Sequence, residues 1–173
     1  ALAAALFFRD PEREHHAAEG DILSPADGRI VAVGRVPEDQ RLGAEALRIS
    51  VFMSVFNVHI NRIPMDATVV GVKHVPGGFA MAHLDAAGAI NERTEVMLVD
   101  DSGRKALMVQ VAGLVARRII CRLKEGDEVM RGGRFGLICF GSRVDLYLPV
   151  GARAAVKIGD RVRAGQSVLA RLH

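Results

Sequence analysis

The Gly141-Ser142 step has the residue types and spacing that best suit a covalent reaction within the chain. It lies between two runs typical of β-strands, 135–140 and 144–149. Glycine adopts backbone dihedral angles that other residues resist, and its carbonyl is open to approach. The Ser142 hydroxyl is one residue from the Gly141 carbonyl, as an intramolecular attack requires. Because most Gly-Ser steps are simple turns, the step indicates chemistry only if a base accompanies it.

A candidate base, His59, comes shortly after the apolar run 47–56. Strand-like alternation puts it on the same side of the chain as Asn57 and Asn61. Such a polar side is either a solvent-exposed face or the edge of an active site. Arg62 follows, and its planar guanidinium suits a phosphate or a carboxylate.

Five motifs occur in a fixed order along the chain, and together they are far more specific than any one of them. They resemble the short, archaeal-type branch of the phosphatidylserine decarboxylase family over essentially the whole sequence. The motifs are Phe7-Phe8-Arg9-Asp10-Pro11-Glu12-Arg13, Leu23-Ser24-Pro25-Ala26-Asp27-Gly28, Phe56-Asn57-Val58-His59-Ile60-Asn61-Arg62-Ile63-Pro64, Asn91-Glu92-Arg93 and Phe140-Gly141-Ser142-Arg143.

The resemblance implies that Ser142 becomes a covalent pyruvoyl group, the cofactor of this family. The chain would break between Gly141 and Ser142, giving a large subunit, residues 1–141, and a small subunit, residues 142–173. The mature enzyme would convert phosphatidylserine to phosphatidylethanolamine and carbon dioxide. Its pyruvoyl ketone would serve as the electron sink for the carbanion left by the departing carbon dioxide.

The resemblance also implies roles for two further residues. His59 matches the family's catalytic histidine, which would act as general base toward Ser142 and as a proton donor in decarboxylation. Asp27 matches the catalytic aspartate, which orients and charge-balances that histidine. Without the other motifs, Asp27 is better explained as a turn residue whose carboxylate caps its own backbone. Some members of the wider family have an acid at the position of Asn57, and without it Asp27 would assist His59 alone.

Three residues are candidates for substrate binding, namely Phe56, Asn57 and Arg62. Residues 51–53 together with Phe56 would supply an apolar pocket for the carboxylate, which favours loss of carbon dioxide. The alternative for these four residues is an ordinary place in the core, which we expect for at least half of them.

The motif Lys-x-Gly-Asp-x-Val occurs twice, at 124–129 and at 157–162, each time followed by an apolar strand. This repetition resembles the hammerhead units of lipoyl- and biotinyl-type barrel-sandwich folds. We therefore predict a mostly β (α+β) fold, a compact single domain made of two related units and a few short helices. Ser142 lies between the repeated motifs.

Composition limits the classes of partner. The chain has 173 residues, 18 of them glycine, a net charge of +3 and a pI of about 9.2. This charge is too small to indicate nucleic acid but is compatible with an anionic membrane surface. We interpret Cys121 and Cys139 as reduced core residues, and His15-His16 as solvated residues rather than metal ligands. No metal is expected.

The apolar stretch 1–8 is shorter than the roughly 20 residues that a membrane span requires. With the resemblance, it is predicted to be the remnant of an N-terminal anchor. Residues 1–19 then form anchor remnant and juxtamembrane linker, and 20–173 the decarboxylase domain. The expected location is the cytoplasmic side of the cell membrane, held peripherally or by that anchor. The sequence leaves homo-oligomerisation open.

Three alternatives stay open from the residues. A pyruvoyl decarboxylase could act on another amino substrate, such as a soluble amino acid. A non-enzymatic lipoyl- or biotinyl-like carrier would need a lysine at a hairpin tip, whereas Lys124 and Lys157 precede their Gly-Asp turns. A Ser-His-Asp hydrolase would need a Gly-x-Ser-x-Gly elbow, which Ser142 lacks.

Overall fold

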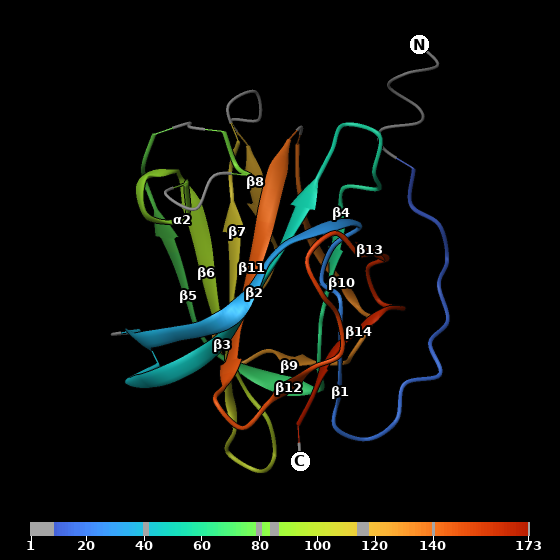
Figure 1. The fold of residues 1–173 in the computed structure, drawn as a ribbon, viewed down its shortest axis with the longest axis vertical. Coiled ribbons are helices and arrows are strands. Elements are labelled where there is room, and N and C mark those ends of the chain that lie inside the picture. Colours follow the sequence, from blue (N-terminus) through green and yellow to red (C-terminus); the bar gives the residue numbers. More distant parts are fainter. Residues whose placement is uncertain are drawn as a thin grey trace.

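The computed structural model describes residues 9–39, 42–78, 81–83, 87–113, 118–139 and 141–172. Eight strands form one antiparallel sheet in the order β13-β2-β3-β11-β7-β6-β5-β9, which curls into a half-barrel (Figure 1). Its strands are β2 (Gly28–Asp39), β3 (Ala44–Met53), β5 (Ala67–Val75), β6 (Arg93–Val99), β7 (Lys105–Val111), β9 (Glu128–Val129), β11 (Ser142–Pro149) and β13 (Arg161–Val162).

Two three-stranded sheets accompany the large one, in the orders β1-β14-β12 and β4-β10-β8. Their strands are β1 (Asp21–Leu23), β4 (Ile60–Arg62), β8 (Ile119–Cys121), β10 (Arg134–Ile138), β12 (Arg153–Ala154) and β14 (Val168–Arg171). The only helix among the described residues is the four-residue α2 (Ala87–Ile90). The predicted mostly β fold is thus confirmed.

The two halves of the molecule repeat one arrangement. From either end, the large sheet begins with a two-residue strand, β13 or β9. Next comes a long strand that follows a Pro-x-Asp turn: β2 after Asp27 and β5 after Asp66. The order then continues through β3 or β6 to the central pair β11 and β7. The duplication predicted from the repeated motif therefore extends through the whole sheet.

Each Lys-x-Gly-Asp-x-Val motif makes the same turn. The glycine has a positive φ, 93° at Gly126 and 96° at Gly159, which favours glycine over other residues. The aspartate side chain accepts a hydrogen bond from the N–H of the motif's lysine, at 2.8 Å in one copy and 2.9 Å in the other. Backbone hydrogen bonds then hold each turn on a neighbouring strand, at Val69 of β5 or Ile30 of β2.

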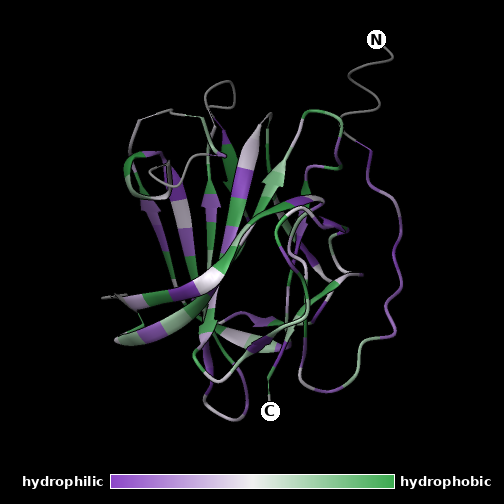
Figure 2. Cartoon of the chain, in the orientation of Figure 1, coloured by the Kyte–Doolittle hydropathy of each residue, from purple (hydrophilic) through white to green (hydrophobic). Residues whose placement is uncertain are grey.

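Strand alternation divides the large sheet into two faces. The main core lies between the large sheet and the two small sheets, because its buried residues come from all three. A smaller cluster of Leu107, Val109 and Val111 covers the opposite face. Figure 2 shows apolar and polar bands alternating along these strands. Ser142 belongs to the core-facing set of β11, and Arg143 to the opposite set.

The segment 9–19 has neither helix nor strand and follows the outside of the small sheets (Figure 1). Arg134 holds it through Asp10 at 2.8 Å and Glu12 at 2.6 Å. Within the described ranges, no helix is both long and apolar enough to cross a membrane. The apolar stretch 1–8 and Phe140 lie outside the described residues.

Candidate active site

Ser142 is the first residue of β11, opposite Met53 of β3, and is fully buried. Its Oγ donates to the Met53 sulfur at 3.6 Å. Gly141 has a φ of 58°, in the left-handed region where other residues are strained. The uncommon backbone predicted at this glycine is therefore present at the bond that Ser142 would attack.

Gly113 lies against the Gly141 carbonyl and was not found from the sequence. A Cβ at position 113 would come within 1.7 Å of the Gly141 oxygen, closer than any real contact. The absence of a side chain at 113 thus makes room for the candidate scissile carbonyl. In the sequence Gly113 is an ordinary glycine after the strand-like run 105–111. Its contact with Gly141 arises only because β7 pairs with β11 in the fold.

Two buried amides extend from Ser142 along the core face. Asn61 donates to the Met53 sulfur at 3.7 Å, and Gln110 donates to the Asn61 side-chain oxygen at 2.8 Å. All three polar residues are completely buried, and Gln110 Oε1 has no hydrogen-bond partner among the described residues. On the core face of the sheet the surroundings of Ser142 are therefore polar but uncharged, whereas the buried ion pair of Arg143 and Asp145 lies on the opposite face. A glutamine in the apolar run 105–111 is the signal that could have identified Gln110.

His59 is 2% exposed and precedes β4. Its Nδ1 lies 2.9 Å from the Asn57 carbonyl, which can only accept, so Nδ1 donates and Nε2 of the neutral ring carries the lone pair. Burial is the main reason why the pKa of His59 is lower than usual; Arg9 lowers it further, while the Asn57 carbonyl and Asp27 act in the other direction. The ring is thus neutral near pH 7 and chemically suited to accept a proton.

Asp27 is held by residues other than His59. Arg13 binds both of its oxygens, Oδ2 at 2.9 Å, and the backbone N–H of Ala164 donates to Oδ1 at 2.8 Å. Its influence on the pKa of His59 is electrostatic, and it is the smallest of the four contributions. The sequence suggested a direct aspartate–histidine arrangement, whereas in the structure Arg13 takes up the carboxylate.

The three candidate substrate-binding residues lie in different surroundings. Arg62 is 4% exposed and donates to the carbonyls of Pro11 and Gly132, both at 2.9 Å. Asn57 accepts from the N–H and hydroxyl of Ser54 at 2.8 and 2.9 Å. Phe56 is 83% exposed. Only Asn57 and Phe56 reach the cavity described next.

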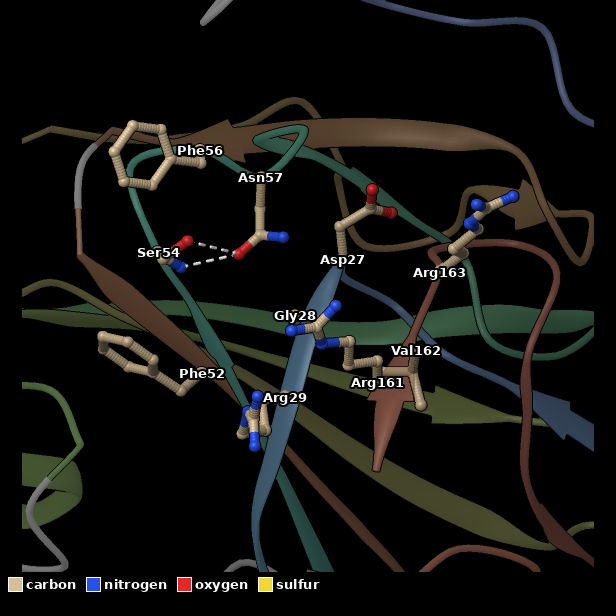
Figure 3. A pocket seen from close by; sticks show the side chains of 10 residues that line it. All are labelled: Asp27, Gly28, Arg29, Phe52, Ser54, Phe56, Asn57, Arg161, Val162 and Arg163. Carbon is tan, nitrogen blue, oxygen red and sulfur yellow. Dashed lines mark hydrogen bonds between the residues drawn. The ribbon is translucent and has the colours of Figure 1, made fainter. Parts of the chain in front are cut away.

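A cavity of about 670 Å³ opens at the β13 end of the large sheet (Figure 3). In this view the rings of Phe52 and Phe56 stand on one side, with Arg161 and Arg163 on the other. No group of three His, Cys, Asp or Glu in the described ranges could hold a metal ion. The lining residues are Asp27, Gly28, Arg29, Phe52, Ser54, Phe56, Asn57, Arg161, Val162 and Arg163.

The other residues of the expected apolar pocket are divided between cavity and core. Phe52 lines the cavity, whereas Val51 and Met53 are completely buried in the main core.

Cys121 and Cys139 are free and half-buried, and burial raises the pKa of both thiols, which keeps them protonated.

Comparison with known proteins gives consistent matches over the whole chain. Residues 2–170 match the family model described as phosphatidylserine decarboxylase. A phosphatidylserine decarboxylase proenzyme from Nitrosomonas europaea is 50% identical over 173 residues, 100% of this chain and 80% of that protein. A proenzyme of the same name from Burkholderia ambifaria is 51% identical over 166 residues, 96% of this chain and 77% of that protein.

Proposed function

The chain belongs to the phosphatidylserine decarboxylase family, and from this premise we propose that Ser142 is the residue at which the proenzyme is processed and carries out its reaction. The chain is an enzyme that decarboxylates phosphatidylserine to phosphatidylethanolamine. The observation that carries the assignment of Ser142 is its position directly after a left-handed glycine whose carbonyl oxygen is accommodated by Gly113. These matches favour the lipid over a soluble amino acid as substrate.

The first proposed step is cleavage of the chain. The Ser142 Oγ attacks the Gly141 carbonyl carbon, and its proton passes to Nε2 of His59. The C–N bond of the peptide breaks and an ester to Oγ forms in its place. Loss of the Ser142 α-proton then breaks the Oγ–Cβ bond, which releases the Gly141 carboxylate. Water replaces the nitrogen left on residue 142, with release of ammonia, to give a pyruvoyl group.

The surroundings of Ser142 suit this group. A ketone is neutral and only accepts hydrogen bonds, and the residues Met53, Asn61 and Gln110 on the Ser142 side of the sheet are uncharged. Asn61 offers its amide N–H as donor, and Gln110 holds that amide in place. When present, the pyruvoyl group supplies an electron sink for decarboxylation. Asn61 would orient it, and His59 would deliver the proton that replaces the carboxylate.

We propose that the enzyme works at the cytoplasmic surface of the cell membrane. A basic chain and two exposed apolar residues beside the cavity, Val55 at 45% and Phe56 at 83%, support this placement. The lipid headgroup would enter the cavity from that side. Val55→Ser with Phe56→Ser should shift the protein from pelleted vesicles to the supernatant, whereas unchanged pelleting would contradict the placement.

The test of the proposed processing is an intact mass measurement of the wild-type chain. We expect two products that end and begin between Gly141 and Ser142, the smaller lighter by one ammonia than a peptide starting with serine. His59→Ala should remain a single chain under the same conditions. A wild-type protein that decarboxylates phosphatidylserine while uncleaved would overturn the assignment of Ser142.

A further inference from the structure

Two arginines face each other beside the cavity. Arg29 of β2 lies directly opposite Arg161 of β13 and, on its other side, opposite Phe52 of β3. Like charges in directly opposite positions of a sheet destabilise it. Both arginines are exposed, and neither forms a salt bridge or side-chain hydrogen bond with any described residue. Neither arginine is therefore paired with a carboxylate of the described residues.

Facing arginines elsewhere in the described sheets have acidic partners. Arg62 lies opposite Arg134, and Asp10 and Glu12 accompany this pair. Asp10 is 3.6 Å from Arg62 and 2.8 Å from Arg134. The sheet thus tolerates facing arginines where carboxylates share the charge.

The third facing pair follows the same rule. Arg153 lies opposite Arg171, and Asp21 binds Arg171 at 3.1 Å from the next strand. At the corresponding side of Arg29 the neighbour is Phe52, which carries no charge. Of the three facing arginine pairs in the described strands, only the pair at the cavity has no carboxylate partner.

The fold itself does not require this pair. In the other half of the molecule β9 pairs with β5 as β13 pairs with β2, and there Glu128 lies opposite Thr68. The same hairpin therefore forms without two like charges. The arginine pair is present at the β13 end of the sheet and absent from the β9 end, which indicates that a ligand binds at the β13 end.

The walls of the cavity define the ligand's chemistry. Arg29, Arg161 and Arg163 line the cavity and favour an anion, since the lining carboxylate, Asp27, is already paired with Arg13. An arginine fork matches phosphate oxygens. Phe52 and Phe56 add an apolar wall, which suits the glycerol and acyl part of a lipid. Together they describe a phosphate carried on an apolar body.

A row of facing residues connects the arginines to β11, the strand that begins with Ser142, although the row lies on the face of the sheet opposite the Ser142 side chain. Phe52 lies opposite Arg29 on one side and opposite Arg143 on the other, and Arg143 is next to Ser142. Arg29 is therefore two strand spacings, about 10 Å, from Arg143, and Arg161 is one spacing further. Resting on the function proposed above, we propose that Arg29 and Arg161 bind the phosphodiester of phosphatidylserine while its serine moiety reaches position 142.

The first experiment measures decarboxylation of dihexanoyl phosphatidylserine, kept below the concentration at which it forms micelles. Arg29→Gln and Arg161→Gln should each raise KM about tenfold, equivalent to about 1.4 kcal/mol of binding, with a smaller effect on kcat. Arg153→Gln is the matched control, since it removes an exposed arginine from a two-residue strand outside the cavity. Its KM should stay within about twofold of the wild-type value. Unchanged KM in both cavity variants would overturn the proposal.

A second experiment does not depend on activity. Inorganic phosphate should raise the unfolding temperature of the uncleaved Ser142→Ala protein, and this shift should disappear when Arg29→Gln and Arg161→Gln are added. Stabilisation by phosphate together with an unchanged KM would assign the cavity to free phosphate and overturn the lipid assignment. A raised KM without stabilisation by phosphate supports a site that requires the whole lipid.

The two proposals fail in different ways. If the wild-type chain neither breaks after Gly141 nor releases carbon dioxide, the proposed function fails. The phosphate-dependent unfolding temperature still reports on the arginines in that case.

Discussion

At one end of the large sheet Asp66 accepts a hydrogen bond from the backbone N–H of Arg131 at 2.7 Å, and at the other end Asp27 accepts the same bond from Ala164 at 2.8 Å. Each aspartate follows a Pro-x turn and precedes the long strand of its half, β5 or β2. The shared bond is therefore a requirement of the repeated fold. What distinguishes Asp27 is the buried guanidinium of Arg13, which has no counterpart at Asp66 in the described residues.

The same comparison holds along the rest of the two halves. His59 precedes β4, whereas Gly20 stands before β1, the matching strand of the other small sheet. Arg29 faces Arg161 where Thr68 faces Glu128. Where the halves agree, a residue serves the duplicated fold. Where the halves differ, we expect the residue to take part in catalysis or substrate binding, and substitutions can test each difference.

The largest effect is expected at Gly113, beside the candidate scissile bond. Gly113→Ala forces the Gly141 carbonyl away from its place, since the added Cβ would lie 1.7 Å from that oxygen. A shift of about 1 Å at a reacting group can cost about a hundredfold in rate, so self-cleavage should fall by at least that much. The fraction of cleaved chain on a denaturing gel over time measures it. Gly34→Ala is the control, because a Cβ there meets nothing within 4 Å; similar slowing in both would refute the steric argument.

The two aspartates separate structural from chemical roles. Asparagine keeps the oxygen that caps the backbone but removes the charge. Asp27→Asn leaves the buried Arg13 without its counter-ion and should cost about 3 kcal/mol of unfolding free energy. Asp66→Asn should cost less than about 1 kcal/mol, because only a backbone bond is affected. Urea unfolding of both proteins on a Ser142→Ala background gives the comparison, and equal losses would show that the halves use their aspartates alike.

Features that depend on neighbouring residues were predictable from the sequence. The Lys-x-Gly-Asp-x-Val turns need a left-handed glycine and an aspartate that caps its own turn, and both requirements are local. The unusual backbone of Gly141 is local too. From these positions the duplicated β fold and the candidate nucleophile, Ser142, could be predicted.

Features that depend on strand pairing were not predictable in the same way. The neighbours of Gly113 and the facing of Arg29 with Arg161 arise only when distant strands pair. Asp27 finds its partner Arg13 in a segment without helix or strand, where no periodic pattern gives a position. Arg62 carries the right chemistry for an anion but is occupied by backbone carbonyls.

A moderate effect is expected from the pH dependence of His59, which has no counterpart in the other half. Cleavage requires the neutral ring, and burial lowers the pKa of His59 below its usual 6.5. The cleavage rate should therefore be constant around neutral pH. As the pH is lowered further the rate should fall, with the midpoint of the fall below pH 6.5. Cleavage of freshly translated chain in a series of buffers measures this midpoint.

Asn57→Asp sharpens the same test. It adds a negative charge two residues from His59 and keeps the oxygen that accepts from Ser54. The added charge favours the protonated ring, so the midpoint should move to higher pH than in the wild type. A midpoint that stays in place would mean that His59 does not control cleavage.

The smallest effect on stability, and the most direct conversion of one half into the other, is expected from Arg161→Glu. It puts a glutamate where the matching strand β9 has Glu128, so that Arg29 faces an opposite charge rather than a like one. An exposed pair of this kind should raise the unfolding free energy by about 0.5 kcal/mol, whereas KM for phosphatidylserine should rise, since a carboxylate now repels the phosphate. Replacing a residue that stabilises the fold lowers the unfolding free energy of the protein. Replacing a residue that only binds a ligand weakens ligand binding and leaves the unfolding free energy unchanged or higher. Thermal unfolding and KM measured on the same preparation distinguish these cases: a variant that is less stable but binds substrate normally would place Arg161 among the structural residues.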